Sequence, residues 1–176
     1  MEMKKSDEFK ISHNLNIKVI TLSDRASRGE YEDLSGKYIL DELNNYFDKN
    51  KWNFSSEKIV IPDSSEILKS EIINLLQSKT DILFTTGGTG ISPRDITIET
   101  IKPFITKEIP GIMEFIRVKY GEKIPNALLS RGISGLMEQT LVFTLPGSVK
   151  AVKDYMTEIL KVLEHLVFMQ YHIDVH

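Results

Sequence analysis

The clearest structural signal in this chain is the stretch Asp81-Ile82-Leu83-Phe84-Thr85-Thr86-Gly87-Gly88-Thr89-Gly90. Its first six residues form a nearly continuous apolar run of strand length, which is typical of a strand covered by helices on both faces. The glycines follow at once, and their lack of side chains lets successive backbone N–H groups converge on an anion such as phosphate. The stretch therefore predicts a buried strand that leads into a phosphate-binding turn, although an isolated Gly-Gly-x-Gly also suits a tight structural turn.

Three more segments have the length and composition of strands, and apolar residues at helical spacing lie between them. Strands are expected at residues 16–22, 58–61 and 140–145, and helical stripes at 39–47, 68–76, 98–105, 112–116 and 149–163. Thr97 could cap the third helix, and Pro110-Gly111 separates it from the fourth, which should end near Gly121. Ser55-Ser56 and Gly132 to Gly135 are expected as loops. The alternation implies a mostly parallel sheet sandwiched between helices, with ligands beyond the carboxyl ends of the strands.

The composition suits one globular domain, because 41% of the 176 residues are hydrophobic and 27% are charged. The absence of cysteine excludes disulfides, thiolate zinc sites, iron–sulfur clusters and a cysteine nucleophile. The net charge of −3 argues against nucleic acid as a partner. We find no signal peptide and no membrane-spanning stretch, so we expect a cytoplasmic protein. The domain is expected at residues 16–166, between a flexible extension at 1–15 and a tail at 167–176.

Two aspartates follow predicted strands and could hold a metal ion. Asp95 lies just after the glycines in Ser92-Pro93-Arg94-Asp95-Ile96-Thr97, where Arg94 adds a guanidinium suited to phosphate. Asp63 lies in Pro62-Asp63-Ser64-Ser65, after the second strand. Capping of a helix is an alternative role for each aspartate. If both loops lie at one end of the sheet, the two carboxylates face a common cleft and would make a Mg²⁺ site with a polyphosphate.

Three further loops suit hydrogen bonding to a ligand with several polar edges. They are Ser23-Asp24-Arg25, Ser130-Arg131 and Pro146-Gly147-Ser148. Arg25 and Arg131 could equally be solvated surface charges. The chain contains neither the Walker motif Gly-x-x-x-x-Gly-Lys-Ser/Thr nor the dinucleotide-binding motif Gly-x-Gly-x-x-Gly. The absence of the second motif counts against a dehydrogenase. The four histidines have no ligand-like spacing, so zinc or histidine chemistry is not expected.

Taken in order along the chain, these motifs resemble those of the MogA/MoaB family of molybdopterin-binding proteins. The matching segments are Leu22-Ser23-Asp24-Arg25-Ala26-Ser27, Thr85-Thr86-Gly87-Gly88-Thr89-Gly90, Pro93-Arg94-Asp95-Ile96-Thr97, Pro110-Gly111, Leu129-Ser130-Arg131 and Leu145-Pro146-Gly147-Ser148. The resemblance implies a three-layer α-β-α sandwich that is commonly a homotrimer. It also implies adenylyl transfer from MgATP to molybdopterin, which yields adenylylated molybdopterin and pyrophosphate. The product accepts molybdate in a later step, for which a molybdenum-insertion protein would be a partner.

By the same resemblance, Asp63 and Asp95 correspond to two carboxylates associated with catalysis and with Mg²⁺ bound through ATP. The substrate-binding residues that it implies are Ser23, Asp24, Arg25, Gly87, Gly88, Thr89, Gly90, Ser130, Arg131, Pro146, Gly147 and Ser148. The chain departs from the family pattern at Ile98, where many members have proline, and it lacks the C-terminal tail of some MogA-type members. A non-catalytic MoaB-like protein that binds molybdopterin or acts as a scaffold therefore stays an open alternative.

Overall fold

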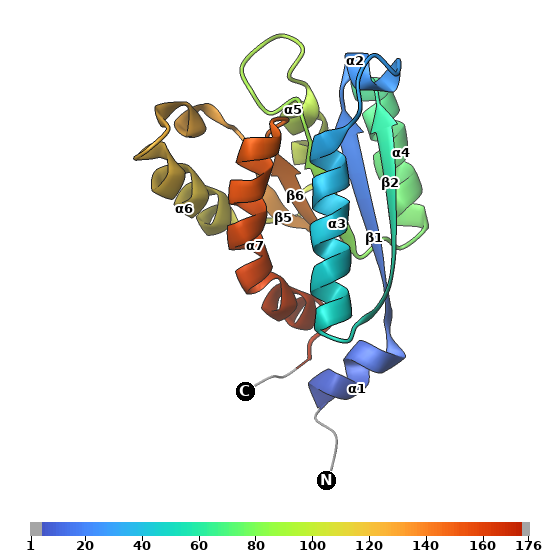
Figure 1. The fold of residues 1–176 in the computed structure, drawn as a ribbon. Helices are drawn as coiled ribbons and strands as arrows, with labels where there is room; N and C mark the ends of the chain where they lie inside the picture. The colour runs from blue at the N-terminus through green and yellow to red at the C-terminus, as the bar shows by residue number, and fades with distance from the viewer. Residues whose placement is uncertain (1–4, 174–176) are drawn as a thin grey trace.

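The computed structural model describes residues 5–173, and its centre is a six-stranded sheet in the order β2-β1-β3-β6-β5-β4 (Figure 1). The strands are β1 (Asn14–Leu22), β2 (Asn53–Ile61), β3 (Ile82–Thr86), β4 (Lys107–Glu108), β5 (Ser134–Met137) and β6 (Thr140–Leu145). β1 pairs in parallel with β2 and β3, and β3 pairs in parallel with β6. β5 is antiparallel to both β4 and β6. The prediction of a mostly parallel sheet is therefore confirmed.

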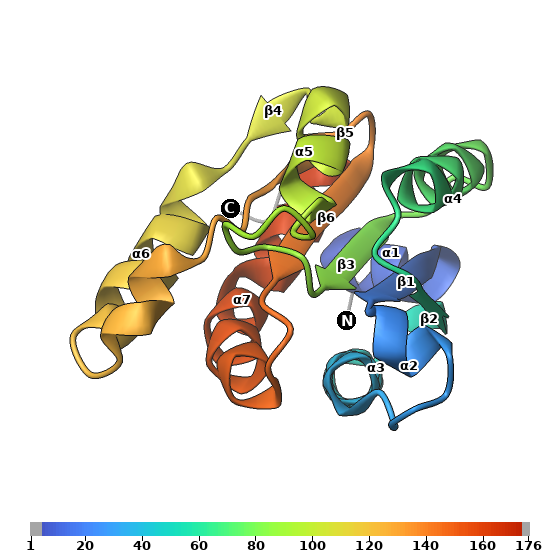
Figure 2. The same cartoon turned by 90° about the horizontal axis from the view of Figure 1, so that it is seen from above.

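Helices cover both faces of the sheet and complete the three expected layers (Figure 2). α3 (Leu34–Lys49) and α7 (Val149–Gln170) lie on one face, and α4 (Ser65–Gln77) and α5 (Thr97–Ile101) lie on the other. The remaining elements are α1 (Lys5–Ser12), α2 (Asp24–Ser27), α6 (Pro110–Gly121) and the 3-10 helices η1 (Lys102–Phe104) and η2 (Pro125–Leu129). None of the helices within residues 5–173 is long and apolar enough to cross a membrane.

Alternate residues of the central strands pack into two hydrophobic clusters, one on each face of the sheet. In β1, Val19 belongs to the cluster with α3 and α7, whereas Ile20 belongs to the cluster with α4. The predicted stripe of α3 is completely buried and consists of Ile39, Leu43 and Phe47. A spacing of four keeps these side chains on one face of the helix. Because both faces of the sheet are covered, β3 and β6 are buried along their whole length.

Two of the predicted loops are strands in the structure. Ser55-Ser56 lies inside β2, which begins at Asn53 rather than residue 58 because an edge strand with one half-exposed face accepts polar side chains. Ser134 and Gly135 are buried and begin β5, so the predicted loop is correct only for its first two residues. A Cβ atom at Gly135 would collide with the Lys107 carbonyl oxygen of β4. Glycine here marks the close approach of two strands.

Structured elements extend past both predicted domain boundaries. Residues 5–12 form α1, in which the ring of Phe9 stacks on His13 and meets Trp52 edge-on. α7 continues to Gln170. The boundaries expected at 15 and 166 thus fall inside β1 and α7. The parts of the expected extension and tail at residues 1–4 and 174–176 lie outside the described residues.

Candidate active site

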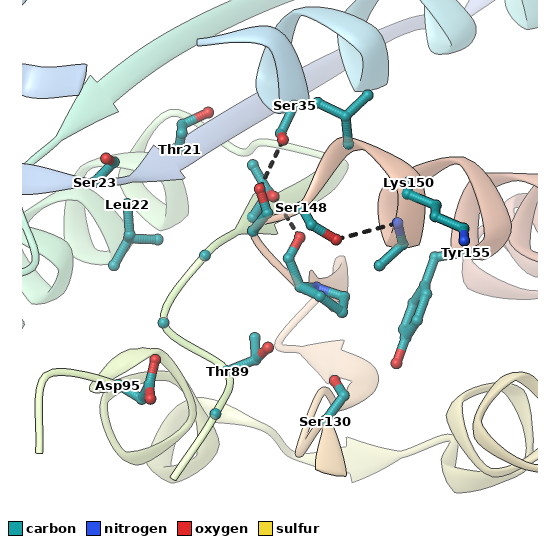
Figure 3. A pocket seen from close by; sticks show the side chains of 18 of the residues that line it. Thr21, Leu22, Ser23, Ser35, Thr89, Asp95, Ser130, Ser148, Lys150 and Tyr155 are labelled. Atoms are coloured by element: carbon teal, nitrogen blue, oxygen red, sulfur yellow. Dashed lines mark hydrogen bonds between the residues drawn. The ribbon is translucent and has the colours of Figure 1, made fainter. Parts of the chain in front are cut away.

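A cleft of about 850 Å³ opens at the carboxyl ends of β1, β3 and β6 (Figure 3). Its lining includes Leu22 at the end of β1, Thr86 at the end of β3 and Pro146 just after β6. β2 lies on one side of β1, whereas β3 and then β6 lie on the other side. The direction in which strands are added to the sheet therefore reverses between β1 and β3. Open α/β sheets bind ligands at such a point, and a cleft of this size accommodates molecules as large as a nucleotide.

The glycine loop at residues 87–90 contributes one side of the cleft. Gly87 and Gly88 have φ angles of 100° and 64°, in the left-handed region that favours glycine. The Gly87 amide donates a hydrogen bond to the Leu145 carbonyl oxygen at 3.1 Å. Within residues 5–173, the amides of Gly88, Thr89 and Gly90 donate no hydrogen bond. Three consecutive N–H groups are therefore available to an anionic ligand.

Thr97 holds the glycine loop in its conformation. Its hydroxyl group donates to the Gly87 carbonyl oxygen at 2.8 Å, and its amide donates to the Gly88 carbonyl oxygen at 3.1 Å. A Cβ atom at Gly88 would collide with the Thr97 hydroxyl, so only glycine permits this approach. Thr97 is the first residue of α5, which begins without a side-chain cap, so the predicted capping role of Thr97 is wrong.

Arg131 acts on the glycine loop from outside the cleft. It does not line the cleft but lies in a smaller hollow of about 310 Å³, where its guanidinium pairs with Glu99. Its Nε donates to the Gly90 carbonyl oxygen at 2.7 Å, and its amide donates to the Thr89 carbonyl oxygen at 3.0 Å. Arg131 therefore supports the glycine loop in this structure, and its role in substrate binding stays a prediction.

Asp63 lines the cleft and does not cap α4, because the Ser64 hydroxyl oxygen accepts the capping hydrogen bond from the Ile67 amide at 3.3 Å. Burial is the main reason why the pKa of Asp63 is raised. The hydrogen bond from the Asp24 amide lowers this pKa, whereas the charges of Asp24 and Asp95 raise it further. A bound cation would relieve both the burial of the charge and the repulsion between carboxylates.

Asp95 lines the same cleft. Its Oδ2 accepts a hydrogen bond from the Ser92 amide at 2.7 Å, which closes the turn after the glycine loop, and it does not cap α5. Two carboxylates suit Mg²⁺, which prefers oxygen ligands. No group of three or more His, Cys, Asp or Glu side chains within residues 5–173 could hold a metal ion. A Mg²⁺ ion between these carboxylates would therefore need further oxygens from a bound ligand.

Only Ser23 of the first polar loop reaches the cleft. It caps α2 by accepting a hydrogen bond from the Ala26 amide at 3.2 Å, and it hydrogen-bonds the Tyr31 hydroxyl at 2.7 Å. Arg25 lies over the ring of Tyr31, with its Cζ 4.9 Å from the ring centroid. Asp24 hydrogen-bonds the backbone of the Asp63 loop. Asp24 and Arg25 do not line the cleft but contact the loops around it, and their role in substrate binding stays a prediction.

The loop after β6 lines the cleft with Pro146, Gly147 and Ser148, and Ser130 lies nearby in the same lining (Figure 3). Ser148 caps α7 by accepting a hydrogen bond from the Ala151 amide at 3.3 Å. The positive end of the α7 dipole therefore faces the cleft, and a helix N-terminus favours anions.

Some lining residues were missed by the sequence analysis. The Thr86 hydroxyl donates to the Pro146 carbonyl oxygen at 2.7 Å, and the Ser35 hydroxyl donates to the Gly147 carbonyl oxygen at 2.8 Å (Figure 3). Tyr155 also lines the cleft from α7. These side chains gave no signal because a strand threonine, a helix serine and an aromatic residue beside an apolar stripe are ordinary in a core.

Comparison with known proteins agrees with this geometry. The family model for the probable molybdopterin binding domain matches residues 18–165. Molybdopterin adenylyltransferase from Helicobacter pylori strain J99 is 34% identical over 154 residues, which are 87% of this chain and 86% of that protein. Molybdenum cofactor biosynthesis protein B from Staphylococcus epidermidis is 35% identical over 172 residues, 96% of each protein.

A solved structure has the same fold. The crystal structure of the tungsten cofactor synthesizing protein MoaB from Pyrococcus furiosus superposes with a TM-score of 0.77 at 33% identity, covering 92% of this chain and 98% of that one. The match of the family model over most of the chain, the two relatives and the shared fold confirm the resemblance seen in the motifs. The chain belongs to the MogA/MoaB family of probable molybdopterin-binding domains.

Proposed function

We propose that this protein acts in molybdenum cofactor biosynthesis by transferring an adenylyl group from MgATP to molybdopterin. One observation carries the proposal: Asp63, Asp95 and the unpaired amides of residues 88–90 belong to a single cleft. The name of the Helicobacter pylori relative supports the same reaction. Carboxylates for a metal ion and backbone donors for phosphate are the groups that a nucleotidyl transfer requires.

The chemistry needs little from the side chains beyond positioning. The terminal phosphate of molybdopterin is largely ionised near neutral pH, so its oxygen attacks the α-phosphorus of ATP without a general base. A bond forms between that oxygen and the α-phosphorus as the bond to the oxygen bridging to the β-phosphate breaks. The electron pair leaves with pyrophosphate. The enzyme therefore acts mainly by alignment and charge stabilisation.

Each part of the site has a role in this reaction. The amides of Gly88, Thr89 and Gly90 bind phosphate oxygens. Asp63 and Asp95 would hold the Mg²⁺ that accompanies ATP, and this ion would supply positive charge to neutralise the departing pyrophosphate. Arg94 lines the cleft and adds positive charge beside the two carboxylates. Ser130 and the loop at 146–148 supply further polar contacts.

The second candidate is a non-catalytic protein that binds molybdopterin and passes it on or serves as a scaffold. The MoaB names of the Staphylococcus epidermidis relative and the Pyrococcus furiosus structure favour it. The presence of both Asp63 and Asp95 in one cleft favours the enzyme, because a handover role does not require a pair of carboxylates that could hold a metal ion.

Release of pyrophosphate tests the proposal directly. The purified protein is incubated with molybdopterin, ATP and Mg²⁺, and pyrophosphate is measured by a coupled assay. We expect release that depends on all three components. Absence of release would exclude the enzyme. In that case, molybdopterin binding with an affinity indifferent to MgATP would support the non-catalytic candidate.

The assembly and partners implied by the resemblance remain predictions. A homotrimer would appear in sedimentation equilibrium as three times the 20.1 kDa chain mass. A molybdenum-insertion protein is expected to consume the adenylylated product. The expected cytoplasmic location would place all of these components together.

A further inference from the structure

Tyr155 carries a hydroxyl group that the protein itself does not satisfy. The residue lies in α7, is 3% exposed and lines the cleft. Its hydroxyl oxygen is buried and has no hydrogen-bond partner within residues 5–173. Figure 3 shows the ring extending from α7 with its hydroxyl end on the side where Ser130 lies. Buried polar groups are nearly always paired, so an unpaired phenol in a binding cleft indicates a partner supplied by a ligand.

Two other polar side chains in this part of the fold each donate a hydrogen bond within the protein. The Tyr120 hydroxyl, which also lines the cleft, donates to Glu158 at 3.0 Å. The Arg117 guanidinium donates to the Gly132 carbonyl oxygen at 3.0 Å. A ligand at this end of the cleft would therefore be recognised by the hydroxyl of Tyr155, with the Ser130 hydroxyl beside it.

The walls at the Tyr155 end of the cleft combine apolar and polar side chains. Ile124, Ala127 and Leu129 line the cleft from the η2 segment and Ala151 lines it from α7, and Asn126, Lys150 and Asp154 of the same segments add polar groups. Leu129 is 60% exposed and adds accessible apolar surface to this wall. The carboxylate of Asp95 lies on the far side of Thr89 from Tyr155 (Figure 3). Apolar surface with a few polar groups around it suits a flat heterocycle that has several polar edges.

Tyr155 stays protonated in this setting. Burial raises the pKa of its hydroxyl group, while Ser130 and Arg117 lower it by smaller amounts. The phenol is therefore a hydrogen-bond donor throughout the neutral range.

We propose that Tyr155 is a ligand-binding residue, whose hydroxyl donates a hydrogen bond to an uncharged acceptor, a ring nitrogen or carbonyl oxygen, on a flat nitrogen heterocycle held against η2 and α7. This inference rests on the proposed function, which offers two sources of such a ring. One is the pterin of molybdopterin, and the other is the adenine of ATP. Both present the same acceptor chemistry, so binding experiments decide between them.

Tyr155→Phe tests the inference through two readouts that move in opposite directions. Without ligand, the variant should melt at a higher temperature than the wild type, because it removes an unpaired buried hydroxyl and keeps the ring. In calorimetric titrations with molybdopterin and, separately, with a nonhydrolysable ATP analogue, one affinity should fall about tenfold. The affinity that falls identifies the ring, and the other affinity should stay unchanged.

Tyr171→Phe is the matched control. Tyr171 ends the same helix away from the cleft, and its hydroxyl bonds the Asp81 carboxylate. This variant should melt at a lower temperature and keep both affinities.

If both affinities were unchanged in Tyr155→Phe, the inference would be overturned. A lower melting temperature together with unchanged affinities would show that the hydroxyl group has only a structural role. The proposed function fails separately, if the wild type binds both ligands and releases no pyrophosphate. In that case a loss of affinity in Tyr155→Phe would still support the role of Tyr155.

Discussion

Asp24 and Asp63 hold each other in place through reciprocal hydrogen bonds between side chain and backbone. The Asp63 amide donates to Asp24 Oδ1 at 3.0 Å, and the Asp24 amide donates to Asp63 Oδ2 at 3.2 Å. The pair joins the loop after β1 to the loop after β2. Of the two side chains only Asp63 lines the cleft, so Asp24 acts on the site by fixing the position of its neighbour.

Asp24→Ala should reduce turnover about tenfold, because the Asp63 carboxylate loses the loop that orients it. The free energy of unfolding should fall by about 1 kcal/mol for the lost hydrogen bond. Pyrophosphate release and chemical denaturation measure the two effects. Asp24→Asn keeps an oxygen that can accept from the Asp63 amide, so it should restore most of the stability. Equal losses in both variants would contradict the positioning role.

The raised pKa of Asp63 predicts the pH dependence of the reaction. Binding of MgATP requires the ionised carboxylate, so kcat/KM, which reports the groups of the free enzyme, should rise with pH through the raised pKa of Asp63. Asp24→Asn removes a negative charge that helps to raise this pKa, and the acid limb of the rate profile should move to lower pH. Initial rates of pyrophosphate release at a series of pH values measure the shift. A limb that stays in place would mean that another group controls the profile.

Asp95→Asn should slow turnover by on the order of a hundredfold while leaving molybdopterin binding nearly unchanged. The asparagine oxygen can still accept from the Ser92 amide, so the turn after the glycine loop should keep its shape. Pyrophosphate release gives the rate, and calorimetric titration gives the pterin affinity. If turnover were unaffected, Asp95 would have no part in the mechanism.

Gly88→Ala should destabilise the protein and abolish ATP binding. The residue has a φ of 64°, which costs an alanine about 1–2 kcal/mol, and the new methyl group would meet the Thr97 hydroxyl. Thermal unfolding and nucleotide titration measure the two effects. Gly111→Ala is the control, since a Cβ atom there meets nothing within 4 Å at the start of α6. A similar loss of nucleotide binding in both variants would mean that the loop conformation is unimportant.

Glu158→Gln should lower stability at neutral pH and remove part of its pH dependence. Glu158 accepts hydrogen bonds from Lys119 at 2.7 Å, Lys161 at 2.8 Å and Tyr120 at 3.0 Å. Burial alone would raise its pKa, but these contacts lower it from 4.5 to about 2. The contacts therefore stabilise the folded state above pH 4.5, and this contribution is lost as the pH falls toward 2.

The variant should be less stable than the wild type by about 1.5–3 kcal/mol at pH 7, and the difference should shrink below pH 4. Urea denaturation at a series of pH values measures it. The exposed Glu114 on the adjacent α6 provides a control through Glu114→Gln, which should change little. A difference between wild type and Glu158→Gln that is constant with pH would show that the charge is not the source of the stability.

The turn at residues 87–90 and the strand before it could be predicted because their signals are local. A continuous apolar run indicates a strand that is buried on both faces of the sheet. Consecutive glycines indicate a backbone with positive φ angles, which other residues rarely adopt. The prediction of loops at Ser55-Ser56 and at 134–135 is wrong because pairing with neighbouring strands makes these segments strands. The capping role predicted for Thr97 is wrong for a related reason, since the hydrogen-bond partner of its hydroxyl group lies in a segment distant along the chain.

The residues alone predict the alternation of strands and helices, the mostly parallel sheet and the loops where a ligand would bind, because hydrophobic periodicity depends on near neighbours along the chain. The shared cleft of Asp63 and Asp95 follows from the fold, since parallel pairing through β1 brings the ends of β2 and β3 to the same edge. Only the tertiary structure decided that Asp24, Arg25 and Arg131 support loops and that Tyr155 keeps an unpaired hydroxyl. A side chain's partners are set by the segments that fold beside it, and no local pattern records them.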